Sequence, residues 1–203
     1  MRFIHASDLH IDSPLRGLDR YDGAPVERLR SATRSALERL VDRALAERVD
    51  FLLLAGDIYD RDWQDFHTGL FFRGQMVRLE RAGIRCFIVQ GNHDAQGVIS
   101  RQLTLPSNVT VFSSRAAQTI RLDDLSVAIH GRSFPEREVN EDLVPSYPPP
   151  VPGFFNIGLL HTSLTGRAGH DTYAPTDLPT LVAKGYDYWA LGHVHAREVL
   201  NER

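Results

Sequence analysis

Short runs of apolar residues alternate along this chain with longer segments in which apolar residues recur at helical spacing. The runs that predict strands lie at residues 2–6, 50–55, 84–90, 109–112, 118–122, 125–130, 154–160 and 186–191. Helical spacing predicts one helix that begins at Pro25, a second from about 66 to 81, and a short third over 177–184. This alternation predicts a single α/β domain over residues 1–203, in which helices cover the faces of a sheet.

The composition limits the class of protein to which the chain can belong. Its 203 residues are enough for one large domain with a full core. The formal charge of -3 does not indicate a polyanionic partner, so any contact with nucleic acid must use a local patch. Cys86 is the only cysteine, which excludes a disulfide within the chain. Because the sequence shows neither a signal peptide nor a long apolar run, we expect a soluble, cytoplasmic protein without membrane contact.

Polar side chains gather where the predicted strands end. They are Asp8, His10, Asp57, Asn92, His93, Asp94, His161, His193 and His195. Any one of them alone would fit a solvated loop or a satisfied core group. Ligands of α/β proteins bind at the carboxyl ends of strands, however, so this many candidates at strand ends indicate one site. His67, in a predicted helix, and His130, at the end of a predicted strand, are expected to be structural.

The types of side chain indicate which ligand this site would hold. Imidazoles and oxygen donors without a thiolate argue against structural zinc and favour two divalent cations. The oxygen content favours Mn²⁺, with Fe²⁺, Zn²⁺ or Mg²⁺ as alternatives. Two such ions roughly 3.5–4 Å apart need a bridging ligand and catalyse the cleavage of phosphate esters. The sequence therefore predicts a binuclear centre for phosphate chemistry.

The order of these motifs resembles the calcineurin-like metallophosphoesterase superfamily. The matching elements are Asp8-x-His10, Gly56-Asp57, Gly91-Asn92-His93-Asp94, His161 and Gly192-His193-x-His195. Further segments resemble the nuclease domain of bacterial DNA-repair exonucleases of the SbcD type. These segments are Ser7-Asp8-Leu9-His10, Asp60-Arg61-Asp62-Trp63, His161-Thr162-Ser163-Leu164, residues 169–175 and residues 185–195.

The resemblance implies a fold, a ligand set and an activity. The fold is a four-layer αββα sandwich with two mixed sheets flanked by helices. The implied ligands of the first ion are Asp8, His10, Asp57 and His195. Those of the second are Asp57, Asn92, His161 and His193, with Asp57 as the bridge. His93 would stabilise or protonate the leaving group, and Asp94 would orient the His93 ring.

The implied activity is Mn²⁺-dependent 3′-to-5′ exonuclease action on DNA ends in double-strand-break repair. An SMC-like ATPase subunit would be the protein partner, and a homodimer is a further possible assembly. Such nucleases continue into a capping domain and an ATPase-binding segment, which we expect to be absent from this chain. Compared with the protein phosphatases of the superfamily, Asp62 stands where they carry Gly and Asp94 where they carry Glu.

Two other functions fit the same motifs. One is a binuclear phosphoesterase that acts on a nucleotide or other small molecule, and the other is a non-catalytic binding module, although such modules usually lose ligands. Tyr59 and Trp63 could stack on bases and Arg61 could grip a phosphate, or all three could simply pack the loop. His170 and Asp171 could shape the wall of the pocket.

Overall fold

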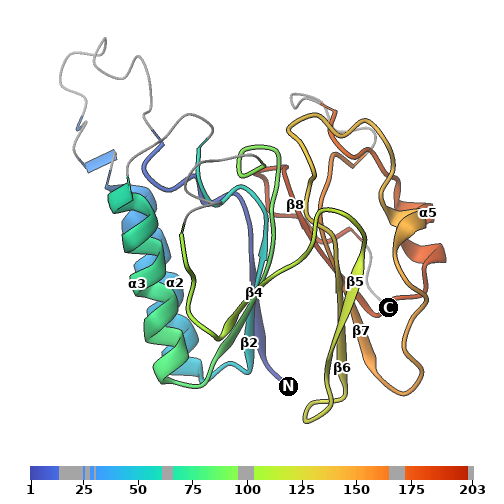
Figure 1. Ribbon diagram of the computed structural model, residues 1–203, viewed down its shortest axis with the longest axis horizontal. Coiled ribbons are helices and arrows are strands. Elements are labelled where there is room, and N and C mark those ends of the chain that lie inside the picture. The colour runs from blue at the N-terminus through green and yellow to red at the C-terminus, as the bar shows by residue number, and fades with distance from the viewer. Residues whose placement is uncertain are drawn as a thin grey trace.

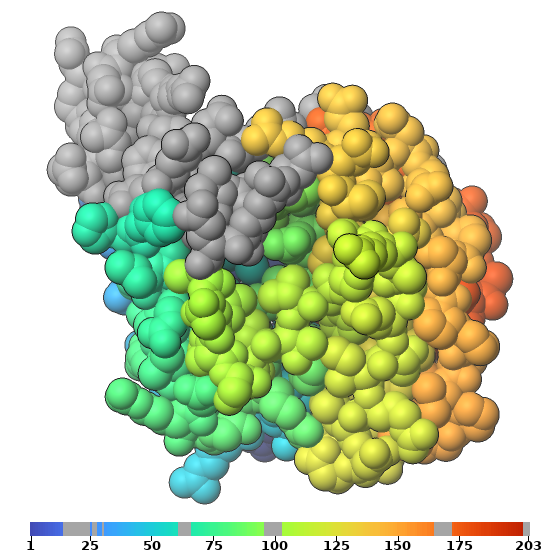
Figure 2. Space-filling model, viewed as in Figure 1, coloured from blue at the N-terminus to red at the C-terminus, as the bar shows by residue number. Residues whose placement is uncertain are grey.

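The computed structural model describes residues 1–13, 25, 28–29, 31–60, 66–95, 103–164 and 172–200. Two four-stranded sheets face one another between helices (Figure 1). The space-filling view places the first half of the chain, from blue to green, on one side and the second half, from yellow to red, on the other (Figure 2). Within the described residues, no helix is long and apolar enough to cross a membrane.

The first sheet is parallel in all its described strands. It contains β1 (Phe3–Ala6), β2 (Phe51–Ala55), β3 (Arg85–Val89) and β4 (Val109–Val111), in that order. Helices α2 (Ala32–Glu47) and α3 (Phe66–Arg81) cover its outer face, and their buried side chains meet Leu52 and Leu54 of β2. Because α2 and α3 connect successive parallel strands, the strands all end at the same edge of the sheet.

The second sheet is mixed. It contains β5 (Gln118–Leu122), β6 (Val127–Gly131), β7 (Phe155–His161) and β8 (Tyr188–Gly192), and only the β5–β6 pair is antiparallel. The short helices η2 (Val144–Ser146) and α5 (Leu178–Ala183) lie on its outer side. Asp177 caps α5, because its side chain accepts a hydrogen bond from the Thr180 amide at 2.8 Å.

A dry layer of apolar side chains joins the two sheets. Phe51, Leu53 and Ala55 of β2 face this layer, where they meet residues of the second sheet such as Ile157 and Leu159. Strand β2 is thus buried on both faces, which explains its uninterrupted apolar sequence. The predicted four-layer αββα arrangement is confirmed, but only the second of the two sheets is mixed, because every described strand pair of the first is parallel. The core of the described residues is divided between three apolar clusters.

Several sequence predictions differ from the structure in detail. Helix α3 has the predicted bounds, and the helical spacing of Leu70 predicts a core position, but Leu70 is 58% exposed. Helix α2 begins at Ala32, but Arg28 and Leu29 before it are also helical, and the Leu29 amide donates to the Pro25 carbonyl at 3.0 Å, as a helix beginning at Pro25 predicts. The proline content of residues 145–152 predicts an extended surface connector. The segment nevertheless buries Tyr147, whose hydroxyl donates to the Leu159 carbonyl at 2.8 Å. The exposure of Leu70 and the burial of Tyr147 are both set by tertiary structure and not by the local pattern.

Candidate metal centre

The parallel strands bring the predicted polar side chains to one edge of the fold. Strands β1, β2 and β3 end just before Asp8, Asp57 and Asn92, while β7 ends at His161 and β8 just before His193. Three backbone hydrogen bonds extend the β1–β2 pairing into the loops: they join the amides of residues 8, 10 and 11 to the carbonyls of residues 56, 57 and 58, at 3.0–3.1 Å. These bonds hold the loops after β1 and β2 side by side at the site.

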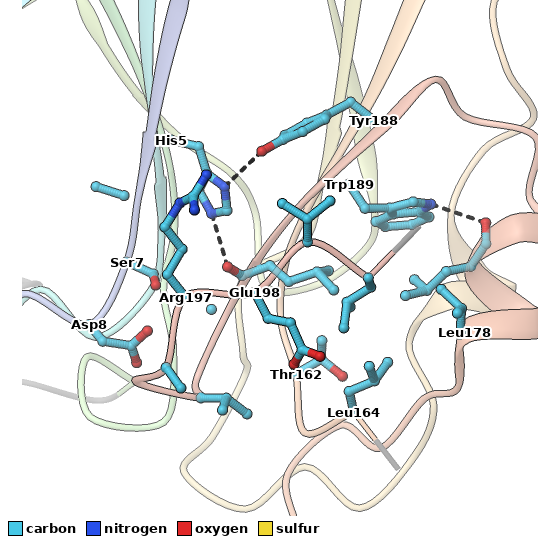
Figure 3. Close-up of a pocket in the computed structure, with 18 of the residues that line it drawn as sticks. His5, Ser7, Asp8, Thr162, Leu164, Leu178, Tyr188, Trp189, Arg197 and Glu198 are labelled. Atoms are coloured by element: carbon cyan, nitrogen blue, oxygen red, sulfur yellow. Dashed lines mark hydrogen bonds between the residues drawn. The ribbon is translucent and has the colours of Figure 1, made fainter. Parts of the chain in front are cut away.

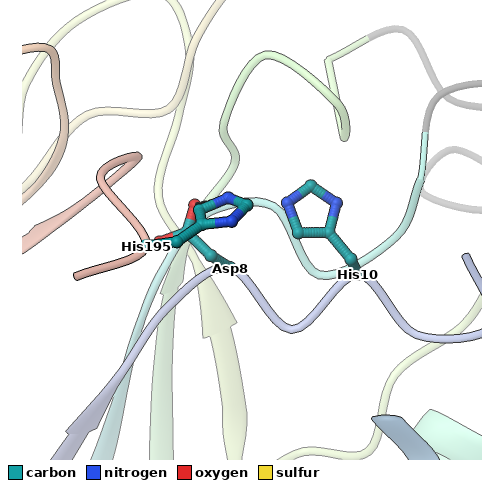
Figure 4. Close-up of side chains that lie close together, drawn as sticks. All are labelled: Asp8, His10 and His195. Carbon is teal, nitrogen blue, oxygen red and sulfur yellow. Dashed lines mark ion pairs between the residues drawn. The ribbon is translucent and has the colours of Figure 1, made fainter. Parts of the chain in front are cut away.

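The first group of donor atoms comes from Asp8, His10 and His195, which lie within 4.8 Å of one another (Figure 4). The Nε2 atom of His195 is 3.7 Å from Asp8 Oδ1, and its side chain is 60% exposed. Asp8 also accepts the backbone amide of His193 at 3.0 Å, which ties the loop after β8 to the loop after β1. This group therefore stands at the open side of the site.

The second group, Asp57, His161 and His193, is buried and has the same 4.8 Å spacing between its donor atoms. The Nδ1 atom of His161 faces the Ala55 carbonyl at 2.9 Å, so it carries a proton, and Nε2 points into the site. His161 Nε2 is 3.0 Å from Asn92 Oδ1 and 3.4 Å from Asp57 Oδ2. Asn92 thus joins this group with its amide oxygen.

Asp57 lies between the two groups. Its Oδ1 atom accepts the backbone amide of His93 at 2.9 Å, which leaves Oδ2 directed at the donors of both groups. This Oδ2 atom is 3.4 Å from His161 Nε2 in the second group and 3.9 Å from His10 Nε2 in the first. A single carboxylate therefore touches both groups, which is the position of a bridging ligand.

The local chemistry of the site fits divalent cations. His10 Nε2 is buried and has no hydrogen-bond partner among the described residues, although a carboxylate oxygen lies 3.9 Å away. A buried polar atom without a partner is costly, and a cation between His10 and Asp57 would remove that cost. Asp57, Asn92 and His161 are each at most 2% exposed, so the second group is also shielded from water.

Electrostatic shifts follow from this crowding. Burial raises the pKa of the Asp57 carboxyl, but the charge and hydrogen bond of His161 outweigh it and lower that pKa to about 2. Burial lowers the pKa of the His161 imidazole, and the Asp57 charge then raises it to about 9. Burial lowers the pKa of His10 below its ordinary value. Without a cation, the second group therefore holds an ion pair in which a proton occupies the cation's place.

Glycines and strained backbone make room for this arrangement. A Cβ atom at Gly91 would lie 2.4 Å from Asp57 Oδ1, so no other residue fits there. Positive φ angles, which residues other than glycine rarely adopt, occur at three residues of the site. They are 54° at Asp8, 40° at His10 and 53° at Asp57. Such strain persists only where surrounding contacts fix it, and it is typical of functional sites.

His93 and Asp94 do not form the contact that the sequence predicted. The Nδ1 atom of His93 faces Asp60 Oδ1 at 2.8 Å. The buried Asp94 carboxylate instead accepts the backbone amides of Ile58 and Tyr59, both at 3.0 Å. Asp60, and not Asp94, therefore orients the His93 ring. The role expected for Asp94 is corrected: its side chain stabilises the loop after β2 by accepting backbone amides of that loop.

Burial and the nearby Asp57 charge raise the pKa of the Asp94 carboxyl to about 7, against the opposing effect of its amide donors. The sequence analysis placed Asp60 in a segment that carries the family resemblance but gave it no role in the site, because the loop has no periodic pattern. That segment, three residues after Asp57, was the signal that could have identified it. The donor atoms of His10, Asp60 and His93 also lie within 4.8 Å of one another, so these three residues form a third group.

The other candidate residues that the structure describes lie away from the metal donors, in the loop core, on the surface or in the second sheet. Tyr59 is 7% exposed and packs edge-on against Phe72, so it belongs to the loop core and not to a base-stacking surface. His67 is exposed on α3, and His130 is a buried structural residue. The remaining candidates lie outside the described residues: Arg61, Trp63, His170 and Asp171.

A cleft of about 880 Å³ adjoins the site. Asp8 and His195 line one end of it, and Tyr188 and Trp189 of β8 line its wall (Figure 3). Across this cleft, His5 of β1 contacts the Tyr188 hydroxyl at 3.1 Å and the Leu191 carbonyl at 2.9 Å. These two contacts join the edge strands of the two sheets three residues before Asp8.

Comparisons with known proteins agree with this site. The model of the family described as calcineurin-like phosphoesterase matches residues 1–197. The chain is 37% identical over 204 residues to an uncharacterized metallophosphoesterase, YhaO, of Bacillus subtilis, covering 99% of this chain and 50% of the relative. It is 25% identical over 212 residues to the DNA double-strand break repair protein Mre11 of Methanopyrus kandleri, covering 96% of this chain and 44% of the relative.

Over a shorter stretch of 117 residues, the chain is 28% identical to one subunit of the nuclease SbcCD of Escherichia coli, covering 56% of this chain and 27% of the relative. The chain thus spans about half the length, or less, of the curated relatives that it matches. The matched residues 1–197 include every strand end that carries a carboxylate, amide or imidazole donor of the site. The chain therefore belongs to the calcineurin-like phosphoesterase family.

Proposed function

We propose that the chain is a metal-dependent phosphodiesterase that removes nucleotides from DNA ends in the 3′-to-5′ direction, with Mn²⁺ as its metal. The observation that carries the proposal is the position of Asp57, whose Oδ2 atom lies 3.9 Å from one group of metal donors and 3.4 Å from the other. A carboxylate shared by two cation sites is the arrangement by which binuclear centres cleave phosphate esters. Relatives described as Mre11 and as an SbcCD nuclease subunit support DNA as the substrate.

The residues sort into two cation sites in this proposal. The first would be held by Asp8, His10, Asp57 and His195, and the second by Asp57, Asn92, His161 and His193. When bound, two such ions neutralise the phosphoryl oxygens and lower the pKa of a water molecule between them. His161 has to lose its Nε2 proton before it can ligate, so protons and cations compete for the second site.

The side chains of the protein contribute the rest of the chemistry. As a water oxygen forms a bond to phosphorus, the P–O bond to the leaving oxygen breaks, and that oxygen leaves with the electron pair and needs a proton. In this proposal His93 supplies the proton from Nε2. The contact of its Nδ1 atom with Asp60 at 2.8 Å and the 4.8 Å distance between its ring and that of His10 support this role. Asp94 fixes the loop beneath, so that the amide of His93 stays on Asp57 Oδ1.

The test compares three substrates with the purified chain in Mn²⁺: duplex DNA labelled at either end, a bis-aryl phosphodiester and an aryl phosphomonoester. We expect release of labelled mononucleotide from the 3′ end, cleavage of the diester, and little action on the monoester, all abolished by chelator. Asp57→Asn controls for contaminating nuclease, and Asp124→Asn, an exposed carboxylate paired with Arg85, is its matched surface control.

Other results would replace the proposal. Cleavage of small phosphoesters without DNA degradation would assign a nucleotide or small-molecule substrate to the same centre. Bound metal with no turnover on any substrate would make the chain a binding module. Association with an SMC-like ATPase and formation of a homodimer stay predictions of the family resemblance, and co-purification with such an ATPase and light scattering test them.

A further inference from the structure

The loop after β1 reaches the proton-donating end of the site through a residue that the proposed function does not use. Ser13 Oγ donates a hydrogen bond to Asp60 Oδ2 at 2.6 Å. The other oxygen of the same carboxylate, Oδ1, faces His93 Nδ1 at 2.8 Å. A continuous path of hydrogen bonds therefore runs from Ser13 through Asp60 to His93, across three segments that are far apart in the sequence.

The loop that carries Ser13 is anchored from two helices. The neighbouring Asp12 receives Arg34 Nε at 2.7 Å and Arg34 Nη2 at 2.5 Å, both from α2. Asp12 Oδ2 also accepts the Thr68 hydroxyl of α3 at 2.5 Å. The Ser13 amide closes a turn on the His10 carbonyl at 3.0 Å. These contacts fix the backbone at Ser13, which lies one turn after His10 of the first cation site.

We propose that Ser13 is a positioning residue, which orients the Asp60 carboxylate so that His93 points its Nε2 proton at the leaving oxygen. The inference rests on the proposed function of His93. An aspartate side chain turns easily about its last bond, so a hydrogen bond to Oδ2 fixes the direction of Oδ1 and with it the plane of the imidazole. Proton transfer is sensitive to such alignment, because the donor must lie within hydrogen-bond reach of the oxygen it protonates.

The consequence is a dependence on the leaving group that a general loss of stability would not produce. A p-nitrophenolate leaves without help from an acid, whereas a nucleoside alkoxide needs a proton as the P–O bond breaks. Ser13→Ala is therefore expected to lower kcat on a thymidine dinucleotide about tenfold or more, a part of the roughly 100- to 10,000-fold available from general acid catalysis. The same variant is expected to cleave bis-p-nitrophenyl phosphate within about twofold of the native rate.

Two further variants control this measurement. Ser13→Thr keeps the hydroxyl and is expected to restore most of the rate on the dinucleotide. Ser133→Ala removes a buried hydroxyl close to the site, which donates to the Phe112 carbonyl at 2.6 Å and accepts the Gln90 amide at 3.0 Å. Both of these hydrogen bonds are to backbone groups away from Asp60, so any loss in Ser133→Ala is expected to be equal on both substrates.

A double-mutant cycle with His93→Ala tests whether Ser13 acts through the histidine. Once His93 is absent, Ser13→Ala is expected to cause no further loss on the dinucleotide, because the two changes remove the same contribution. Additive losses, or equal losses on the two substrates, would overturn the proposal.

A spectroscopic measurement on the metal-free protein is independent of activity. The His93 Nδ1 proton, held by Asp60, is expected as a far-downfield proton resonance, assigned by its absence in His93→Ala. This resonance is expected to survive in Ser13→Thr and Ser133→Ala and to broaden or vanish in Ser13→Ala. If the native chain cleaves neither substrate, the proposed function fails, while an unchanged resonance in Ser13→Ala would refute the positioning role itself.

Discussion

Two histidines of the second sheet are equally buried and have opposite characters. His130 on β6 and His161 at the end of β7 are both 0% exposed. His130 contacts two neutral groups, Thr119 Oγ1 at 2.8 Å and Asn156 Oδ1 at 3.0 Å, and it stacks on Tyr186. Burial accordingly lowers the pKa of His130, so its ring stays neutral and closed to any ligand.

His161 has the same burial but a different neighbour. Burial lowers its pKa as well, yet the Asp57 carboxylate 3.4 Å away more than compensates and raises it to about 9. A buried proton shared between an imidazole and a carboxylate marks a place that a cation can take over. The comparison shows that the exposed fraction does not distinguish a candidate ligand histidine from a structural one. The distinguishing feature is a neighbouring carboxylate that, among the described residues, forms no ion pair with an arginine or lysine.

The largest effect is expected from removal of the carboxylate that makes the two histidines different. Asp57→Asn should lose both ions together and reduce turnover below detection, because this one side chain touches both groups of donors. Metal analysis by mass spectrometry, with Asp124→Asn as the control, measures the ion content per chain. Retention of one full equivalent of metal in Asp57→Asn would show that the carboxylate is not shared.

A second substitution, at His93, tests whether this residue donates a proton or binds a metal ion. His93→Ala should keep both ions and lose roughly 100- to 10,000-fold in kcat, the usual contribution of general acid catalysis. His67→Ala, which alters an exposed histidine of α3, is the matched control and should leave kcat unchanged. Loss of an ion in His93→Ala would instead make His93 a ligand in the group with His10 and Asp60.

Replacement of the structural histidine, His130, should lower stability and leave the metal site intact. His130→Leu deprives the Thr119 hydroxyl and the Asn156 amide of a partner and should lower the free energy of unfolding by about 1–3 kcal/mol. Metal content and kcat per folded molecule should not change. Urea unfolding followed by circular dichroism measures the first effect, and a drop in bound metal would mean that this network also supports the site.

The smallest effect concerns pH. In the metal-free protein the pKa of His161 is raised above the 6.5 of an unfolded histidine, so its contribution to stability is complete below pH 6.5 and disappears as the pH rises through about 9. The raised pKa of Asp94, about 7, acts in the same direction but at lower pH, because its contribution is lost between the unfolded value of 3.8 and about pH 7. The fall above pH 7 therefore comes from His161. With chelator, the urea midpoint should therefore fall between pH 7 and pH 9, whereas with Mn²⁺ it should rise, because the cation replaces the proton. A rising midpoint with chelator would contradict the ion pair.

The sequence predicted the positions of the strands and the polar residues after them because both follow from local pattern. A strand buried on two faces, such as β2, must be apolar throughout, and a polar residue directly after it, such as Asp57, has to serve a purpose at the sheet edge. This reasoning found the candidate ligands. It could not show that Asp57 Oδ2 faces both groups, because that depends on how the two sheets pack.

Contacts within loops escaped prediction for a physical reason. The choice between Asp60 and Asp94 as the partner of His93 is made by the amides of residues 58 and 59, which take up the Asp94 oxygens. No spacing along the chain records such competition for hydrogen bonds. In the same way, the exposure of Leu70 depends on what covers the first turns of α3, and its helical spacing alone suggested the core.

The central claim is that one binuclear centre, bridged by Asp57, does the chemistry of this chain. Anomalous diffraction from crystals of the Mn²⁺-loaded protein tests it most directly. The account predicts two peaks roughly 3.5–4 Å apart, both in contact with the Asp57 carboxylate, with His161 on one ion and His10 on the other. A single peak, or peaks that do not touch Asp57, would contradict it.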